Sequence, residues 1–273
     1  MIQTISEMFQ YSFLSRALIV GILVSLCSAL LGVSLVLKRY SMIGDGLSHV
    51  GFGALSIAMA VGWSPLKVSI PVVVISAFFL LKLSKSSKMK GDSAIALISS
   101  SSLAIGVIVT SQSTGLTTDV NNYMFGSILA MSREDIYISV ALSIVVIILF
   151  IFFYNRIFTI TFDEDFAKAT GTKSDFYNML IAFLTAITIV VGMRLMGALL
   201  ISSLIIFPAL TSMRVCKSFK TVIVSSAIIS IVCFFFGMVA SYVFSTPAGA
   251  SVVLVNLCAF AIFFVIQKIR EHI

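Results

Sequence analysis

The sequence predicts an all-α fold, a polytopic bundle of membrane-spanning helices, and three observations predict it. Of the 273 residues, 59% are hydrophobic and only 11% are charged, whereas about a quarter of the residues in an ordinary soluble domain are charged. The hydrophobic residues form long stretches without charge, and several are close to the roughly 20 residues that cross a bilayer as one helix. The basic residues gather between these stretches, as they do in the cytosolic loops of membrane proteins.

The apolar stretches predict about nine spans. We interpret the first as a retained span, because residues 1–15 have neither the basic start nor the small-residue cleavage site of a signal peptide. The sixth and seventh are short and separated only by Arg194, so the number falls to eight if one of them enters the membrane only in part. The predicted spans are 12–37, 41–62, 66–82, 92–112, 136–154, 177–193, 196–213, 221–244 and 249–267.

The basic residues predict the orientation of the chain in the membrane. Fourteen of the 18 Lys and Arg residues fall in five clusters, and all five lie in the cytosol if the N-terminus is outside and the C-terminus inside. The net charge of +7 therefore reflects orientation and does not indicate nucleic-acid binding. The clusters are Lys38 and Arg39; Lys82, Lys85, Lys88 and Lys90; Arg156, Lys168 and Lys173; Arg214, Lys217 and Lys220; and Lys268 and Arg270.

We expect residues 1–273 to form a single transmembrane domain, because the sequence shows no internal repeat, no low-complexity linker and no soluble domain. The longest cytosolic loop covers about 155–176. Within it, three acidic residues open a short helix-forming run that a glycine ends, a pattern typical of a short capped helix. Such a helix is either a solvated part of the loop or a docking element for a cytosolic partner. Its residues include Asp163, Glu164, Asp165, Phe166, Ala167, Lys168 and Gly171.

Two ionisable residues near the start of the second span could bind a metal ion. Asp45 and His49 are four residues apart, so a helix places them on one face, one turn apart. Ionisable groups inside a membrane are costly and usually line a pathway or pair with each other. A carboxylate and an imidazole offer oxygen and nitrogen ligands that zinc and manganese both accept. A structural Asp–His hydrogen bond would have the same spacing, and the residues alone leave both interpretations open.

Several motifs that would indicate an enzyme are absent from the sequence. It contains no GxxxxGK[ST] nucleotide loop, no HExxH pair and no GxSxG elbow, so we expect a non-catalytic protein that does not itself hydrolyse ATP by that route. The four cysteines form no CxxC pair, and we infer neither a disulfide nor a thiolate metal site.

Four segments, in the same order along the chain, resemble the integral-membrane permeases of ABC importers for zinc, manganese or iron. Residues 38–49 resemble that family's basic residues followed by a D-x-x-x-H pair, and 163–171 resemble its cytosolic coupling loop. Residues 197–209 resemble its late G-x-L-L…P-A helix, and 246–249 resemble its final outer turn. The resemblance implies a homodimer in a bacterial cell membrane that binds cytosolic ATPase subunits and receives metal from an extracytoplasmic binding protein.

The resemblance also assigns roles to residues. It implies that Asp45 and His49 belong to the metal pathway and that the acidic loop helix contacts the ATPase. Residues 123–130, together with 246–249, look closer to zinc-type than to manganese-type members, so zinc is the expected cargo and no tightly bound cofactor is expected. The alternatives are a manganese or iron importer of the same family, or an ATP-independent secondary transporter of metal or protons. Secondary transporters often show inverted repeats, and none is visible here.

Overall fold

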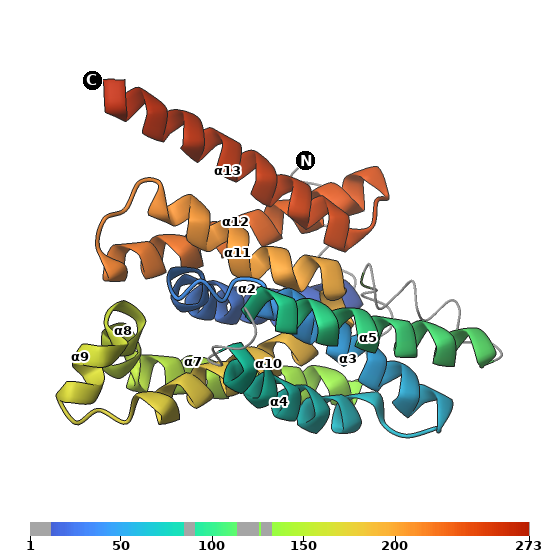
Figure 1. Cartoon of the computed structure of the whole chain (residues 1–273). Coiled ribbons are helices and arrows are strands. Elements are labelled where there is room, and N and C mark those ends of the chain that lie inside the picture. The colour runs from blue at the N-terminus through green and yellow to red at the C-terminus, as the bar shows by residue number, and fades with distance from the viewer. Residues whose placement is uncertain (1–11, 85–90, 114–125, 127–132, 273) are drawn as a thin grey trace.

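The computed structural model describes residues 12–84, 91–113, 126 and 133–272 (Figure 1). These residues form eleven helices and no strand. The helices are α2 (Ser12–Leu37), α3 (Ile43–Ala60), α4 (Pro65–Ser84), α5 (Gly91–Gln112), α7 (Arg133–Phe152), α8 (Tyr154–Phe162), α9 (Glu164–Ala169), α10 (Ser174–Met196), α11 (Ala198–Met213), α12 (Phe219–Phe244) and α13 (Ala248–His272).

Nine of these helices occupy the nine predicted spans. By length and composition, seven of the described helices could cross a membrane, namely α2, α4, α5, α7, α10, α12 and α13. The other two are α3, which contains the Asp–His pair, and α11, whose apolar part is Leu200–Met213. The spans are clear in the sequence because an apolar stretch of this length has few other stable environments.

The division between the sixth and seventh spans differs from the prediction. Arg194 does not separate them, because α10 continues past it to Met196. The break falls at Gly197, whose φ of 85° suits a residue without a Cβ atom. Arg194 remains inside the helix because its guanidinium forms a 2.6 Å ion pair with Asp135 at the start of α7. The Arg194 charge, which the sequence suggested as the boundary between two spans, therefore joins α10 to α7.

The helices differ in how deeply the bundle encloses them. In α2 and α10, 72% of the residues in the most apolar stretch are buried, whereas the figure is 22% in α5 and α13. Helix α2 packs against α7, α10, α11 and α12, and α3 packs against α4, α5, α10 and α11. Figure 1 shows α13 along one edge of the bundle. The central helices α2 and α10 therefore hold the others in place.

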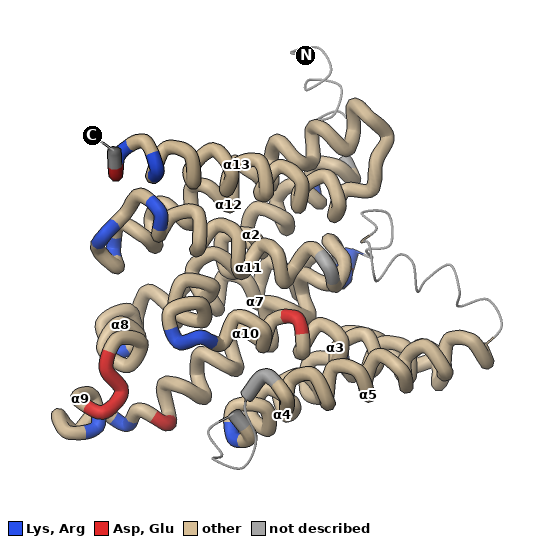
Figure 2. The backbone as a smooth tube through the Cα atoms, turned by 45° about the horizontal axis from the view of Figure 1, so that its top comes forward, with Lys and Arg blue, Asp and Glu red and all other residues tan. Residues whose placement is uncertain are grey.

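The two short helices α8 and α9 lie at one end of the bundle (Figure 1). Figure 2 shows most of the Lys and Arg residues at this same end, together with the C-terminal end of α13. We call it the basic end, and the positive-inside rule predicts that it faces the cytosol. Three residues of the second basic cluster, Lys85, Lys88 and Lys90, lie outside the described residues. The segment 123–130, which the zinc expectation used, also lies outside them apart from Gly126.

Candidate functional site

The Asp–His pair lies in the first two turns of α3. The helix starts at Ile43 without a side-chain cap, and Asp45 is in its first turn, where a carboxylate interacts favourably with the helix dipole. His49 follows one turn later. The distance between His49 Nε2 and Asp45 Oδ2 is 3.7 Å, which is too long for a hydrogen bond. The hydrogen-bonded structural pair that the spacing allowed is therefore not formed in this structure.

The two side chains retain unused capacity to bind a ligand. His49 is 15% exposed and Asp45 is 37% exposed. His49 Nδ1 is buried and has no hydrogen-bond partner among the described residues. A buried polar atom without a partner costs about 1–3 kcal/mol, and the other ring nitrogen, Nε2, faces Asp45 at a distance too long for a hydrogen bond. This observation fits a ligand role better than a purely structural one.

The described residues of one chain do not supply a complete metal site. Within the described part of the chain, no third His, Cys, Asp or Glu joins this pair in a metal-binding group. Structural zinc sites use four protein ligands, and catalytic zinc sites use three and leave the fourth position to water or substrate. The two donors of α3 therefore need additional donors from water, backbone carbonyls or a second copy of the chain.

Close packing of α3 against α5 fixes the position of the pair. A Cβ atom added to Gly46 would lie 2.6 Å from Ile95, and one added to Gly53 would lie 2.8 Å from the backbone oxygen of Ser102. Small residues let helices approach closely in this way. Because Gly46 lies between Asp45 and His49, this contact sets which face of α3 presents the pair.

The predicted capped helix in the cytosolic loop is confirmed as α9. Asp163 is its N-cap, and the Asp163 side chain accepts a 2.8 Å hydrogen bond from the backbone N–H of Phe166. After the helix ends, Gly171 has a φ of 81° and allows the chain to turn away. Asp163, Asp165 and Phe166 are exposed, and Phe166 is 58% exposed despite being apolar.

Two of the predicted coupling residues face the protein itself. Ala167 is fully buried. Glu164 is only 25% exposed, and its two carboxylate oxygens pair with Lys38 at 3.3 Å and with Lys168 at 3.1 Å. Lys38 was expected as part of a cytosolic cluster and of the basic segment before the Asp–His pair, and its contacts with the loop were missed. The partners lie 126 residues apart, and no local pattern could have indicated that they meet.

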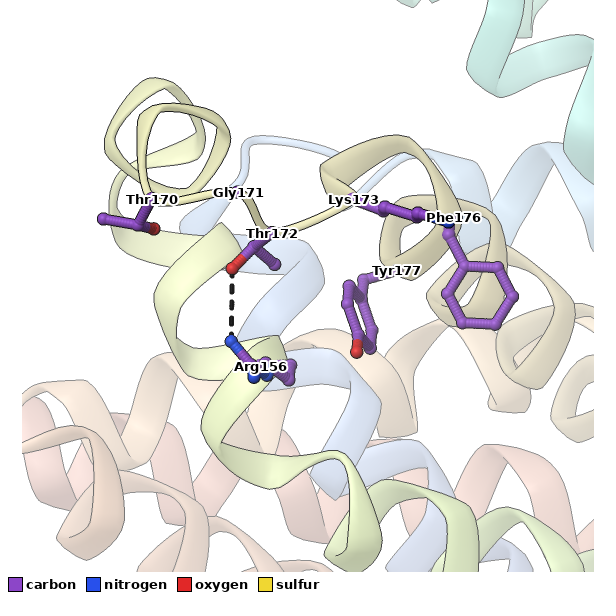
Figure 3. Close-up of a pocket in the computed structure, with 7 residues that line it drawn as sticks. All are labelled: Arg156, Thr170, Gly171, Thr172, Lys173, Phe176 and Tyr177. Atoms are coloured by element: carbon purple, nitrogen blue, oxygen red, sulfur yellow. Dashed lines mark hydrogen bonds between the residues drawn. The ribbon is translucent and has the colours of Figure 1, made fainter.

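A pocket of about 430 Å³ lies between α8, the end of α9 and the start of α10 (Figure 3). Arg156 reaches across it and donates a 3.2 Å hydrogen bond to the Thr172 hydroxyl. With Lys173 also present, the lining has a positive charge. It lies beside the exposed acids of α9, so this end of the molecule presents both signs of charge on its surface. The lining residues are Arg156, Thr170, Gly171, Thr172, Lys173, Phe176 and Tyr177.

Comparison with known families and proteins gives consistent matches over nearly the whole chain. The model of the ABC 3 transport family matches residues 10–267. The chain is 30% identical to the manganese import system permease protein ScaB of Streptococcus gordonii, over 97% of this chain and 96% of that protein. It is 29% identical to the high-affinity zinc uptake system membrane protein ZnuB of Haemophilus influenzae, over 92% of this chain and 97% of that protein.

A solved structure has the same fold. The structure of PsaBC from Streptococcus pneumoniae in complex with Fab matches with a TM-score of 0.87 and 29% sequence identity. The match covers 97% of this chain and 95% of that one. It confirms the predicted all-α polytopic bundle.

Proposed function

Since this chain belongs to the ABC 3 transport family, we propose that it is the permease through which an ABC importer moves zinc into a bacterial cell. The chain is the non-catalytic, multi-pass membrane subunit of an ABC importer for a divalent metal, and ATP is hydrolysed by a separate subunit. Its family membership favours this class over an ATP-independent secondary transporter. Zinc is the finer proposal, and the metal is cargo that passes through the protein.

The observation that supports metal binding most directly is the unsatisfied pair on α3. Asp45 supplies a carboxylate that lowers the net charge of a bound cation, and His49 supplies a nitrogen ligand. Zinc binds both donor types, and imidazole suits it particularly well. Because a permease must also release its cargo, a site with few protein ligands is suitable. Manganese is the second candidate, since ScaB, a manganese import permease, is 30% identical to this chain.

We further propose that the permease works as a homodimer with two ATPase subunits and an extracytoplasmic binding protein. Two copies of the chain supply two carboxylates and two imidazoles. If the two pairs meet near the two-fold axis, they form a four-ligand set suited to tetrahedral zinc. If they remain apart, each copy completes its site with water or backbone oxygens. The number of zinc ions bound per chain, measured on the purified complex, distinguishes one shared site from two separate ones.

The test of this function is metal uptake by the complete complex in proteoliposomes. We expect the parent complex to take up zinc in preference to manganese and iron, and only when ATP is present. His49→Ala removes the only histidine nitrogen on α3 and should abolish uptake while the ATPase subunits remain bound. Ser48→Ala is the matched control, because among the described residues the Ser48 hydroxyl donates only to the backbone oxygen of Asp45. Preference for manganese would overturn the zinc assignment, and parental uptake by His49→Ala would overturn the metal site.

A further inference from the structure

Lys38 is a nearly buried cation that contacts three helices: α8 and α9 of the loop, and α10, which follows them. Its side chain is only 8% exposed. The ammonium group donates to the backbone oxygen of Ile160 in α8 at 3.0 Å and to Glu164 Oε2 in α9 at 3.3 Å. It also donates to Asn178 Oδ1 in α10. Removing a charge from water is costly unless such partners replace the water, so these contacts hold Lys38 firmly to the loop.

A tight turn joins Lys38 to the helix that contains the proposed metal ligands. Lys38 follows the last residue of α2, and Arg39 adopts a left-handed conformation with a φ of 60°. The backbone N–H of Tyr40 donates to the Leu35 oxygen at 2.8 Å. The N–H of Ile43, the first residue of α3, donates to the Tyr40 oxygen at 3.0 Å. Because these bonds fix the turn, a displacement of Lys38 also displaces the first turn of α3, which contains Asp45.

We propose that Lys38 is the positioning residue that transmits movement of α9 to the Asp45–His49 site. In this proposal the cytosolic ATPase acts on the acidic loop helix α9, and Lys38 joins that helix to the turn before α3. When α9 shifts, the Lys38–Glu164 contact moves the end of α2 and the start of α3 with it. This inference rests on the proposed metal site and on the coupling role of α9. It assigns Lys38 no contact with the metal.

Lys168 provides a matched control on the same carboxylate. It pairs with Glu164 Oε1 at 3.1 Å from within α9, one turn along the same helix, and its side chain is 49% exposed. An exposed pair of this kind contributes only a few tenths of a kcal/mol. Losing it leaves the connection from α9 to α2 in place. Replacing either lysine removes one positive charge beside the Glu164 carboxylate. Of the two lysines, only Lys38 connects that carboxylate to a helix other than α9.

The experiment measures metal transported per ATP hydrolysed in the complete complex, including the binding protein, in proteoliposomes. We expect Lys38→Met to lower this ratio by at least about fivefold, the lower end of typical coupling between sites. ATP hydrolysis, ATPase binding and the zinc content of the purified complex should remain near parental values. Lys168→Met should leave the ratio within about twofold of the parent, since exposed pairs contribute little. Lys38→Arg, which can still bond Glu164, should restore part of the ratio.

A second variant keeps the test decisive if Lys38→Met fails to assemble because Glu164 loses its buried partner. The double variant Lys38→Met with Glu164→Gln removes both charges, which is far less disruptive than removing one. It should assemble and show the same uncoupling. A parental transport ratio in either assembled variant overturns the proposal. Failure of both to assemble also overturns it, because Lys38 is then needed for folding rather than for transmission.

His49→Ala separates this inference from the proposed function. That variant should lose bound zinc, whereas Lys38→Met should retain it and lose only the transport yield. If His49→Ala transports normally, the metal site is wrong, yet the ratio for Lys38→Met still reveals whether transport depends on the Lys38 contact. If His49→Ala is inactive and Lys38→Met is fully coupled, the metal site stands and the Lys38 inference is wrong.

Discussion

Two polar pairs within the helical bundle differ in how completely the chain satisfies them. Asp135 and Arg194 join the start of α7 to the end of α10 at 2.6 Å, and each side chain is only 12% exposed. Asp45 and His49 lie 3.7 Å apart on a single helix, and His49 Nδ1 is buried without a partner among the described residues. The first pair is complete within one chain, whereas the second still has capacity for a ligand.

From this difference we predict that the Asp135–Arg194 pair supports the fold and that the Asp45–His49 pair supports transport. Removing one partner of a buried ion pair leaves an uncompensated charge in a poorly solvated place, which is strongly destabilising. The Asp45–His49 pair has no hydrogen bond to lose, so substitutions there should change ligand binding more than folding. Helix α7 leads into α8 at the basic end. The start of α7, with its ion pair, therefore lies toward the opposite end of the bundle.

The largest expected effect is loss of uptake in Asp45→Asn. Asparagine preserves the shape of the side chain but removes the charge that a divalent cation requires, so uptake should collapse while thermal stability stays near that of the parent. Both quantities are measured on equally abundant complexes, uptake in proteoliposomes and unfolding by a thermal scan in detergent. Near-parental uptake would sink the ligand assignment and return the pair to a structural role.

The next largest effect is loss of stability in Arg194→Met. Asp135 then loses the guanidinium that pairs with it at 2.6 Å, and we expect a loss of about 3–5 kcal/mol, the usual penalty for breaking a buried pair. Thermal unfolding of the detergent-solubilised permease measures it. The double variant Asp135→Asn with Arg194→Met should recover most of the stability, because no buried charge remains. An Arg194→Met protein as stable as the parent would show that this pair does not hold α7 and α10 together.

A smaller effect is the change in unfolding temperature on adding metal, which should depend on the Asp45–His49 pair and not on the Asp135–Arg194 pair. A ligand that binds only the folded state stabilises it by about 2.7 kcal/mol at 100 times its dissociation constant. Zinc should therefore raise the unfolding temperature of the parent and of the Asp135→Asn/Arg194→Met variant, and it should leave His49→Ala unchanged. Equal stabilisation of His49→Ala by zinc would mean that the ion binds elsewhere. Repeating the scan with manganese tests which of the two ions the site prefers.

The features that could be predicted from the sequence are those set by local patterns. The spans follow from apolar stretches of bilayer length, the shared face of Asp45 and His49 follows from their spacing, and α9 follows from its acids and Gly171. The contacts that could not be predicted join residues far apart in the sequence. Asp135 meets Arg194 across 59 residues, and Lys38 meets Glu164 across 126.

Those distant contacts also explain where the interpretation of the sequence was wrong. Arg194 looked like a boundary between spans because a lone charge inside a membrane helix is costly, but Asp135 compensates it. Glu164 was expected to be exposed because it lies in an acidic run, but it pairs with Lys38 and is only 25% exposed, and its docking role stays a prediction. In both cases a charge was judged by its neighbours in sequence, whereas its partner in space determines its role.

The smallest expected effect applies the same comparison to two acids of the cytosolic loop. Asp163 is satisfied within the chain, because its side chain caps α9 at the N–H of Phe166. Asp165 is exposed and has no partner among the described residues. Asp163→Ala should lower the stability of α9 by about 1 kcal/mol, the usual value of an N-cap, which is measurable as faster amide hydrogen exchange in 164–169. Asp165→Ala should leave that exchange unchanged and instead weaken binding of the ATPase subunit, measured by titration into the solubilised permease. If Asp165→Ala binds the ATPase as tightly as the parent, the exposed acid does not contact that subunit, and docking must rely on other exposed residues of α9 such as Phe166.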